Sequence, residues 1–112
     1  MISKDKFKEL RSSGLGERFD DGKTRYSLIP PEALEGLAEI YSKGAERHAD
    51  YNWLGLSEER ILDAMERHIM EYKKGNKWNM KDWGHHTLLH VAWGALNLAY
   101  IDIMEEPCNS KS

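Results

Sequence analysis

The feature that most restricts the fold is the segment from His85 to Met104, the least charged part of an otherwise charged chain. At about 100° per residue, its apolar residues form one broad helical face. These residues are Leu88, Leu89, Ala92, Ala95, Leu96, Ala99 and Ile103. A helix that is apolar around most of its surface is typically the central helix of its domain. We therefore expect a central helix, with Asp82 as its candidate N-terminal cap and with its end before Pro107.

A polar stripe runs along the same segment. His86, His90 and Asn97 fall within a sector of roughly 40° in helical projection. Polar side chains on a buried helix must be hydrogen-bonded or must line a cavity. Two interpretations remain open for the histidines. They are core or subunit-contact residues, or His86 and His90, at positions i and i+4, present their imidazoles to a metal ion or a phosphate, with Asp82 as a further carboxylate.

Length and composition exclude several classes of protein. The chain has 112 residues and a net charge of −3 at pH 7. This length predicts a single domain, residues 1–112, and the slight acidity argues against binding to a nucleic-acid strand. We expect a cytoplasmic protein with no membrane partner, because no apolar leader is visible and Gly, His and Asn interrupt the most apolar segment. Cys108 is the single cysteine, which excludes a disulfide framework.

Three further helices are expected. A short one covers residues 1–11, a second opens with Pro31 and extends to about His48, and a third is capped by Ser57 and ends at Lys73-Lys74-Gly75. No sustained strand alternation is present. The fold class is therefore all-α: three main helices, a short N-terminal helix and a long loop before the second helix. We expect the core to be completed by oligomerisation and residues 107–112 to form a mobile tail.

The loops carry candidate ligand-binding residues. Lys23 and Arg25, in the long loop before the second helix, would hold an anion or would simply be solvated. Asn52 and Trp53 have the chemistry to read and stack a nucleobase, although Trp53 would equally fill the edge of the core.

Carboxylates recur on one face of the second helix. Glu32, Glu35 and Glu39 would form a solvated acidic stripe in a monomer. If another helix or subunit covers this face, the same spacing suits Mg²⁺, which prefers hard oxygen ligands together with substrate phosphates.

The third helix has a charged ladder on its far side. Asp63, Arg67 and Glu71 follow one another at intervals of four, and His68 lies at the margin of the apolar face. An exposed ladder contributes little to stability. As the wall of a site, it offers a carboxylate for a metal and a guanidinium for a phosphate.

Several segments in a fixed order carry a family resemblance between residues 20 and 103. They are Asp21-Gly22-Lys23-Thr24-Arg25, Pro30-Pro31-Glu32-Ala33-Leu34, Gly44-Ala45 with Arg47, Asn52-Trp53, Asp63-Ala64-x-x-Arg67-His68, Gly75, and Asp82-x-Gly84-x-His86-x-x-x-His90-x-Ala92. Together these segments resemble small phage proteins described as dATP/dGTP diphosphohydrolases, which are related to the MazG-type all-α nucleotide pyrophosphohydrolases.

The resemblance implies removal of pyrophosphate from a purine deoxynucleoside triphosphate, with Mg²⁺ or Mn²⁺ as the cofactor. MazG-type enzymes hold the metal with an E-x-x-E pair on one helix and an E-x-x-D pair on the next. Glu32-x-x-Glu35 matches the first pair, whereas the second occurs only in reversed order, as Asp63-x-x-Glu66. Helical projection places Asp63 and Glu66 roughly 60° apart, so a shared ion would need help from a neighbouring helix.

Carried over position by position, the resemblance implies three sets of residues. The metal ligands are Glu32, Glu35, Glu39, Asp63 and Glu66. The catalytic candidates are Glu35, Asp63, His86 and His90. The substrate-binding candidates are Lys23, Arg25, Arg47, Asn52, Trp53, Arg67, His68 and Asn97. The MazG-type enzymes have no counterpart for the histidine pair.

Two other functions remain open. A phage protein that sequesters a nucleotide without hydrolysing it needs the same basic and aromatic pocket but no metal carboxylates. A structural or interaction protein would use the histidines and glutamates as surface features. A homo-oligomer, a dimer or a tetramer, is expected in each case, because so few helices leave the acidic face and the aromatic loops uncovered.

Overall fold

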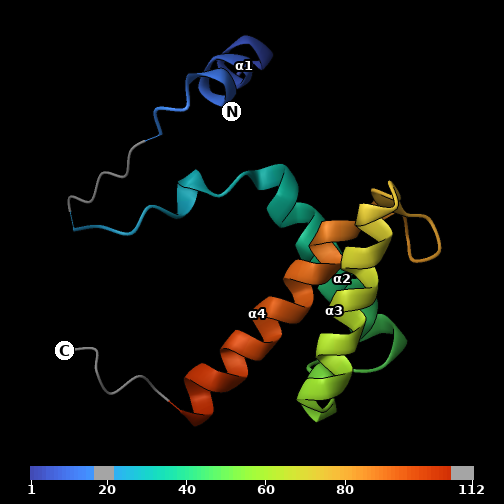
Figure 1. The fold of residues 1–112 in the computed structure, drawn as a ribbon. Helices are drawn as coiled ribbons and strands as arrows, with labels where there is room; N and C mark the ends of the chain where they lie inside the picture. The colour runs from blue at the N-terminus through green and yellow to red at the C-terminus, as the bar shows by residue number, and fades with distance from the viewer. Residues whose placement is uncertain (17–21, 107–112) are drawn as a thin grey trace. The chain divides into compact units, whose positions relative to one another are not determined.

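The computed structural model describes residues 1–16 and 22–106 and is mostly helical, which confirms the all-α class (Figure 1). The chain divides into two compact units, Met1–Pro30 and Pro31–Ser112. Asp21 of the family segments and the tail expected at 107–112 lie outside the described residues.

The first unit contains α1 (Lys4–Ser13) and a short 3-10 helix, η1 (Tyr26–Leu28). Ser3 caps α1, because its hydroxyl oxygen accepts a hydrogen bond of 3.1 Å from the Lys6 backbone N–H. Gly14 ends α1 in the left-handed conformation, with φ of 64°. Lys23 and Arg25 belong to this unit and are exposed.

The second unit is built from α2 (Pro31–Arg47), α3 (Glu58–Lys73) and α4 (Thr87–Glu105), with the 3-10 helix η2 (Asn52–Gly55) between α2 and α3. Ser57 caps α3 by accepting a 3.2 Å hydrogen bond from the Arg60 backbone N–H. Figure 1 shows α2 and α3 running in opposite directions, and α4 packs most extensively on α3 and next on α2. The expected bounds of these helices are confirmed to within a few residues, except at the start of α4.

A short hairpin precedes α4. β1 (Trp78–Asn79) pairs with β2 (His85–His86) in antiparallel fashion, with Trp78 opposite His86. Trp83 and Gly84 have φ of 62° and 73°, which a right-handed helix does not allow. The expectation that Asp82 caps the central helix is therefore wrong. His86 is the cap, since its Nδ1 accepts a 3.1 Å hydrogen bond from the Leu88 backbone N–H.

The buried side of α4 is its polar and small-residue side. Its buried residues are Thr87, His90, Gly94 and Asn97. Ile40 of α2 and Ile61 of α3 are the buried apolar residues of the described chain. The close approach of α3 requires Gly94, because a Cβ there would lie 2.4 Å from Cγ of Met65.

The apolar side of α4 is largely uncovered. Leu96 and Ile103 are 52% and 64% exposed, so within a single chain this broad face is not buried against the other helices. In the described part of the chain, α4 is also the one helix long and apolar enough to cross a membrane, a property shared by core helices of soluble proteins. The tight fit at Gly94 explains the orientation, since only the side with small residues can approach α3 so closely.

Candidate functional site

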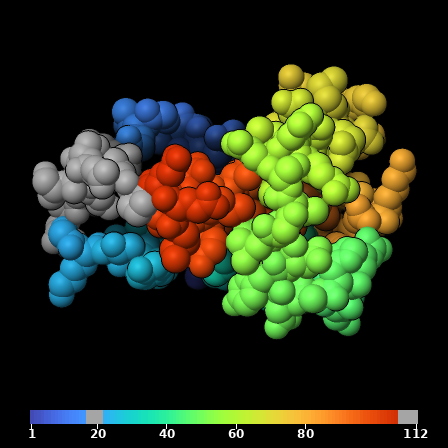
Figure 2. Space-filling model, turned by 90° about the horizontal axis from the view of Figure 1, so that it is seen from below, coloured from blue at the N-terminus to red at the C-terminus, as the bar shows by residue number. Residues whose placement is uncertain are grey.

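Two cavities in the second unit share His68 and Asp82 as lining residues. The first, the aromatic cavity, has a volume of about 670 Å³ and lies between α2, η2, α3 and α4. The second, the charged cavity, has a volume of about 910 Å³ and lies between α3 and the hairpin. Figure 2 shows this face of the unit hollowed between α3 (lime), the segment before it (green) and the loop before α4 (orange).

Aromatic rings form one wall of the first cavity. Tyr41 meets Trp53 edge to face at 6.5 Å between ring centroids and meets Trp93 at 6.4 Å. The Tyr41 hydroxyl donates a 2.5 Å hydrogen bond to Oδ1 of the buried Asn97. Burial raises the pKa of Tyr41, which keeps this hydroxyl protonated as a donor. The hydrogen bond therefore holds the Tyr41 ring in place as part of the cavity wall. Asn97 is buried and does not itself line the cavity.

Basic side chains also line the aromatic cavity. The guanidinium of Arg47 lies over the ring of Trp83, 5.2 Å from its centroid. Arg60 and His48 line the same space. Flat rings next to guanidinium groups suit a ligand that has both a planar apolar part and an anionic part.

Three histidine rings adjoin one another, and two of them, His68 and His90, line this cavity. His68 of α3 stacks on His90 of α4, with ring centroids 4.8 Å apart and 24° between the planes. His85 of β2 meets His90 edge to face at 6.3 Å. His85 Nε2 lies 2.8 Å from Oε1 of Glu39. Of the described side chains, His85 Nδ1 and His90 Nε2 are among the few buried polar atoms without a hydrogen-bond partner.

The surroundings of His90 disfavour a positive charge on its ring. Burial, together with the smaller effects of His68 and His85, lowers the pKa of His90 to about 4, and Asp82 acts in the opposite direction. Burial also lowers the pKa of His68, against the opposing effect of Asp82. Both rings are therefore neutral at pH 7, and His90 is able to exchange a hydrogen bond or accept a proton without being a permanent cation.

The expected pairing of His86 with His90 is not found. His86 precedes α4 and packs against Trp78 at 5.2 Å and against Tyr72 at 5.9 Å between ring centroids. The i, i+4 argument fails because the two residues do not lie on one helix. His85 takes the place next to His90 instead. Sequence reasoning missed it, although Gly84 is the turn signal that separates the hairpin from the helix.

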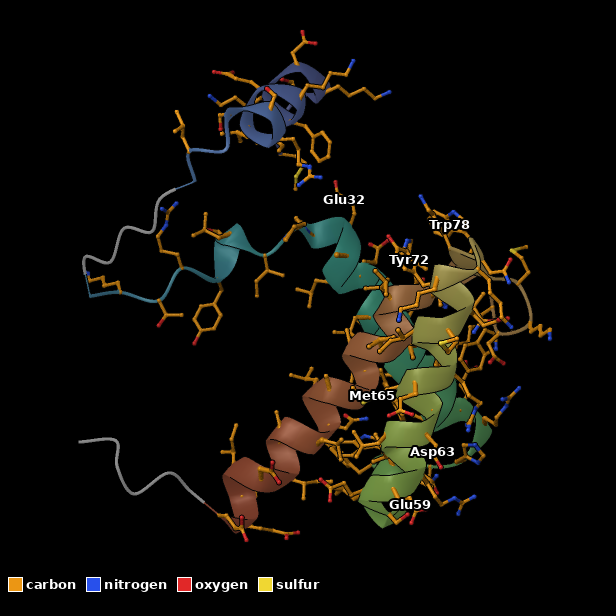
Figure 3. The ribbon with its side chains drawn as sticks, viewed as in Figure 1. Glu32, Glu59, Asp63, Met65, Tyr72 and Trp78 are labelled. Atoms are coloured by element: carbon orange, nitrogen blue, oxygen red, sulfur yellow. The ribbon has the colours of Figure 1, made fainter. Side chains whose placement is uncertain are left out.

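The carboxylates expected to bind a metal on α2 and those on α3 do not come together within one chain. Glu32 and Asp63 lie at opposite ends of the helical unit (Figure 3) because α2 and α3 run in opposite directions. Glu35 is exposed, and Glu39 faces His85. Across residues 1–16 and 22–106, no group of three or more His, Cys, Asp or Glu side chains is arranged to hold a metal ion. The described residues of a single chain thus contain no ready-made group of three ligands for the expected Mg²⁺ site.

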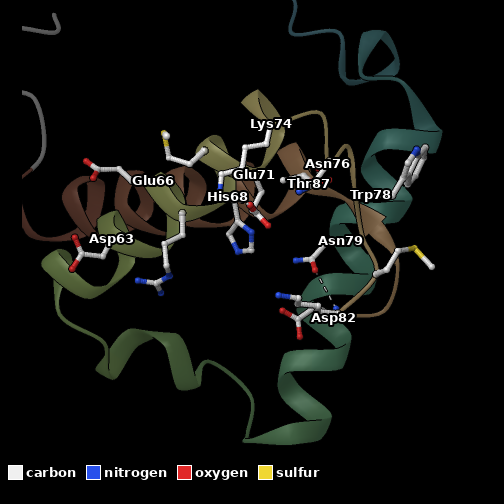
Figure 4. Close-up of a pocket in the computed structure, with 14 residues that line it drawn as sticks. Asp63, Glu66, His68, Glu71, Lys74, Asn76, Trp78, Asn79, Asp82 and Thr87 are labelled. Atoms are coloured by element: carbon white, nitrogen blue, oxygen red, sulfur yellow. Dashed lines mark hydrogen bonds and ion pairs between the residues drawn. The ribbon is translucent and has the colours of Figure 1, made fainter.

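Asp63 and Glu66 line the charged cavity with Arg67 and Lys74. In Figure 4, Asp63 and Glu66 lie at one side of this cavity and Asp82 lies at the other, with His68 between the two sides. The Asp82 backbone N–H donates a 3.2 Å hydrogen bond to Asn79 Oδ1. This hydrogen bond stabilises the loop between β1 and β2, in which Asp82 lines both cavities.

The structure brings part of the expected substrate set together. Arg47, Asn52, Trp53 and His68 line the aromatic cavity, whereas Arg67 lines the charged one. Sequence reasoning did not select several residues that line the aromatic cavity. These are Tyr41, Arg60, Trp83 and Trp93.

Comparison with known proteins agrees with the family resemblance. A family profile described as "dATP/dGTP diphosphohydrolase, N-terminal" matches residues 13–110. The chain belongs to this family. A protein of Salmonella phage PMBT28 named "dATP/dGTP diphosphohydrolase" is 36% identical over 86 residues, which cover 77% of this chain. The match covers 29% of that relative, and no solved structure matches the chain. Both cavities lie within the residues that match the dATP/dGTP diphosphohydrolase N-terminal family.

Proposed function

We propose that this chain binds a purine deoxynucleoside triphosphate in the host cytoplasm and hydrolyses it to the monophosphate and pyrophosphate. The observation that carries the proposal is the aromatic cavity, in which stacking rings, two arginines and a neutral histidine pair meet. Its volume of about 670 Å³ falls within the usual range for small-molecule sites. Membership of the dATP/dGTP diphosphohydrolase N-terminal family supports the same substrate class.

The base would occupy the aromatic part of the cavity. Trp53 and Tyr41 offer ring faces and edges, and stacking on aromatic side chains stabilises bound bases by about 1–3 kcal/mol each. The exposed Asn52 amide, on the same segment as Trp53, is able to donate to and accept from the edge of a base.

The phosphates would extend past His68 and Asp82 towards the charged cavity. Arg47 and Arg60 lie on the aromatic side of this shared wall, and Arg67 lies on the other side. Guanidinium groups hold phosphate oxygens in bidentate fashion and offset the charge that develops on a pyrophosphate leaving group.

His90 would accept the proton of the attacking water. The water oxygen bonds to the α-phosphorus, the bond from this phosphorus to the bridging oxygen of pyrophosphate breaks, and the water's proton goes to the imidazole. A ring that is neutral at pH 7 has the free lone pair that this step requires.

A divalent ion, Mg²⁺ or Mn²⁺, belongs to the proposal as cofactor. It would neutralise phosphate charge when bound. The separated carboxylates of one chain do not form its site, so we propose that the ligands come together in a dimer or tetramer. The uncovered apolar side of α4, with Leu96 and Ile103, supports such an assembly. A strict monomer in light scattering at micromolar concentration would refute it.

The test is a panel of the eight common nucleoside triphosphates, with and without Mg²⁺ or Mn²⁺, with products separated by chromatography. We expect metal-dependent release of pyrophosphate and of a purine deoxynucleoside monophosphate. Glu35→Gln and His90→Ala then examine the glutamate face and the histidine cluster separately. Absence of turnover with every nucleotide contradicts the proposal.

The second candidate is a protein that sequesters a nucleotide without turnover. The separation of Glu32 from Asp63 favours it, because sequestration requires the aromatic cavity but no metal carboxylates. Quenching of tryptophan fluorescence by a purine nucleotide, without product formation, would identify this alternative.

A further inference from the structure

Two aromatic residues that line the aromatic cavity have a left-handed backbone. They are Tyr51, with φ of 59°, and Trp83, with φ of 62°. Within residues 1–16 and 22–106, no other residue apart from glycine has a positive φ. A left-handed backbone costs free energy for any residue with a Cβ atom, and it is rare for a bulky side chain. Such strain is typically found where a ligand is held, so both positions are candidates for a role in binding.

Tyr51 lies in a turn that another residue would form at lower cost. The Asn52 backbone N–H donates a 3.2 Å hydrogen bond to the Ala49 carbonyl oxygen, which closes a turn with Tyr51 at its third position. A third position with positive φ normally holds glycine or asparagine. Tyr51 is 71% exposed, and its ring meets Trp53 edge to face at 6.5 Å. Burial therefore does not explain a tyrosine at this position, whereas a contact with a ligand would.

Trp83 lies in the loop between β1 and β2, which backbone hydrogen bonds hold in place. The N–H groups of Asp82 and Gly84 both donate to the Asn79 carbonyl oxygen, at 3.1 and 2.9 Å. These bonds fix the residues on both sides of Trp83 and involve no part of its side chain. The turn would therefore form with glycine or asparagine at position 83, and the tryptophan adds only its ring.

The Trp83 ring combines an apolar surface with a positive charge. The Arg47 guanidinium lies 5.2 Å from a ring centroid of Trp83, and His85 meets the ring edge to face at 6.3 Å. Trp83 is nevertheless 39% exposed, so part of it remains accessible to a ligand. Purine bases stack on tryptophan rings and on guanidinium planes, and a guanidinium also binds phosphate oxygens. The pair of Trp83 and Arg47 therefore suits a purine nucleotide.

Trp53 has a more enclosed environment. Its ring meets three tyrosine rings edge to face at 6.0 to 6.5 Å, those of Tyr41, Tyr51 and Tyr100. These rings cover part of the Trp53 surface and fix it as the support of the aromatic wall. Tyr51 and Trp83 are more exposed than Trp53, and both therefore lie at the mouth of the aromatic cavity.

We infer that Tyr51 and Trp83 are base-binding residues, which stack on the purine at the mouth of the aromatic cavity while Trp53 and Tyr41 form its inner wall. The inference rests on the proposed function, because it names residues that bind the purine of the proposed substrate. The strained backbone at both positions is retained for ligand binding and not for packing.

The first test is binding without turnover. The α,β-methylene analogues of dGTP and dATP cannot release pyrophosphate, and isothermal titration calorimetry with Mg²⁺ gives their Kd for the full chain. Stacking on one ring corresponds to about 5- to 150-fold in Kd. We therefore expect Trp83→Asn and Tyr51→Asn each to raise Kd by at least about fivefold, and Trp83→Phe, which keeps a ring, to raise it less. An unchanged Kd in either asparagine variant overturns the assignment of that residue.

The second test separates stacking on the base from a general loss of the site. Tripolyphosphate has the phosphates of the substrate but no base, so its Kd should stay nearly the same in Trp83→Asn and Tyr51→Asn. Tyr26→Asn is the matched control, because Tyr26 is an exposed tyrosine that does not line the aromatic cavity, and it should change neither Kd. Equal losses of affinity for the nucleotide analogues and for tripolyphosphate would contradict the inference.

The third test is the stability of the same variants. Asparagine tolerates a left-handed backbone, so Tyr51→Asn relieves strain and removes little buried surface. We expect its Tm to be unchanged or higher while its affinity for the analogues falls. A lower Tm together with an unchanged Kd would show that the ring is retained for packing, which overturns the inference.

Failure of the inference and failure of the proposed function give different results. Turnover of a purine deoxynucleoside triphosphate by the unaltered chain, with an unchanged Kd in both asparagine variants, refutes the inference alone. Binding that depends on Trp83 and Tyr51, without any turnover, refutes the proposed hydrolysis and supports the inference. Absence of binding to either analogue contradicts both.

Discussion

Gly94→Ala is the substitution with the clearest expected effect on stability. Gly94 is buried in the middle of α4, against α3. An added Cβ would lie 2.4 Å from Cγ and 2.8 Å from Sδ of Met65, and 3.4 Å from Cγ2 of Ile61. Two of these distances are below any normal contact, and they involve the middle of the Met65 side chain. Either Met65 must leave its rotamer or α3 must move away from α4.

The magnitude follows from two opposing effects. Overpacking of a close-packed interior costs about 1–3 kcal/mol, whereas glycine to alanine in a helix interior gains about 1 kcal/mol. Because two atoms would overlap, we expect a net loss of about 1–2 kcal/mol. Gly44→Ala in α2 is the matched control. No heavy atom of the described residues would lie within 4 Å of its Cβ, so this variant should gain about 0.5–1 kcal/mol.

Urea and thermal unfolding followed by circular dichroism measure both variants. For a unit of this size, each kcal/mol corresponds to roughly 4–8 °C in Tm. In a Met65→Ala background the overlapping atoms are gone, and Gly94→Ala should become neutral or stabilising. A Gly94→Ala protein at least as stable as the unaltered chain would refute the close packing of α3 on α4.

Three further predictions concern pH and single hydrogen bonds. The folded pKa of His90, about 4, lies below its ordinary value of 6.5, so its neutral ring stabilises the fold above pH 6.5 and this contribution is lost as the pH falls towards 4. With solvent screening, the free energy of unfolding should fall by roughly 1–2 kcal/mol over this range, and His90→Gln should flatten the dependence. Tyr41→Phe leaves Oδ1 of the buried Asn97 without its donor and should cost about 1–3 kcal/mol in urea unfolding; an unchanged midpoint would contradict the hydrogen bond. Ser57→Ala removes the acceptor for the Arg60 N–H and should cost about 1 kcal/mol, measured as a lower Tm.

Local sequence signals were sufficient for most of the helices. Ser3, Ser57 and Pro31 mark helix starts through chemistry that involves only neighbouring residues, and Gly14 and Gly75 mark ends through their left-handed backbone. The same reasoning failed at the start of α4. The predicted helix was extended back through Trp83 and Gly84, whose positive φ angles are incompatible with a right-handed helix. This extension placed His86 inside the helix, whereas α4 begins one residue later.

The sequence by itself determined the all-α class, the helix ends and the polar stripe that required partners or a cavity. Tertiary structure decided which side of α4 is buried, because only the side with Gly94 admits α3 at close range. It also decided which histidines meet. His68, His85 and His90 come from three different elements, and periodicity within one segment contains no information about distances between segments. The separation of Glu32 from Asp63 has the same origin, since the opposite directions of α2 and α3 follow from how the helices pack.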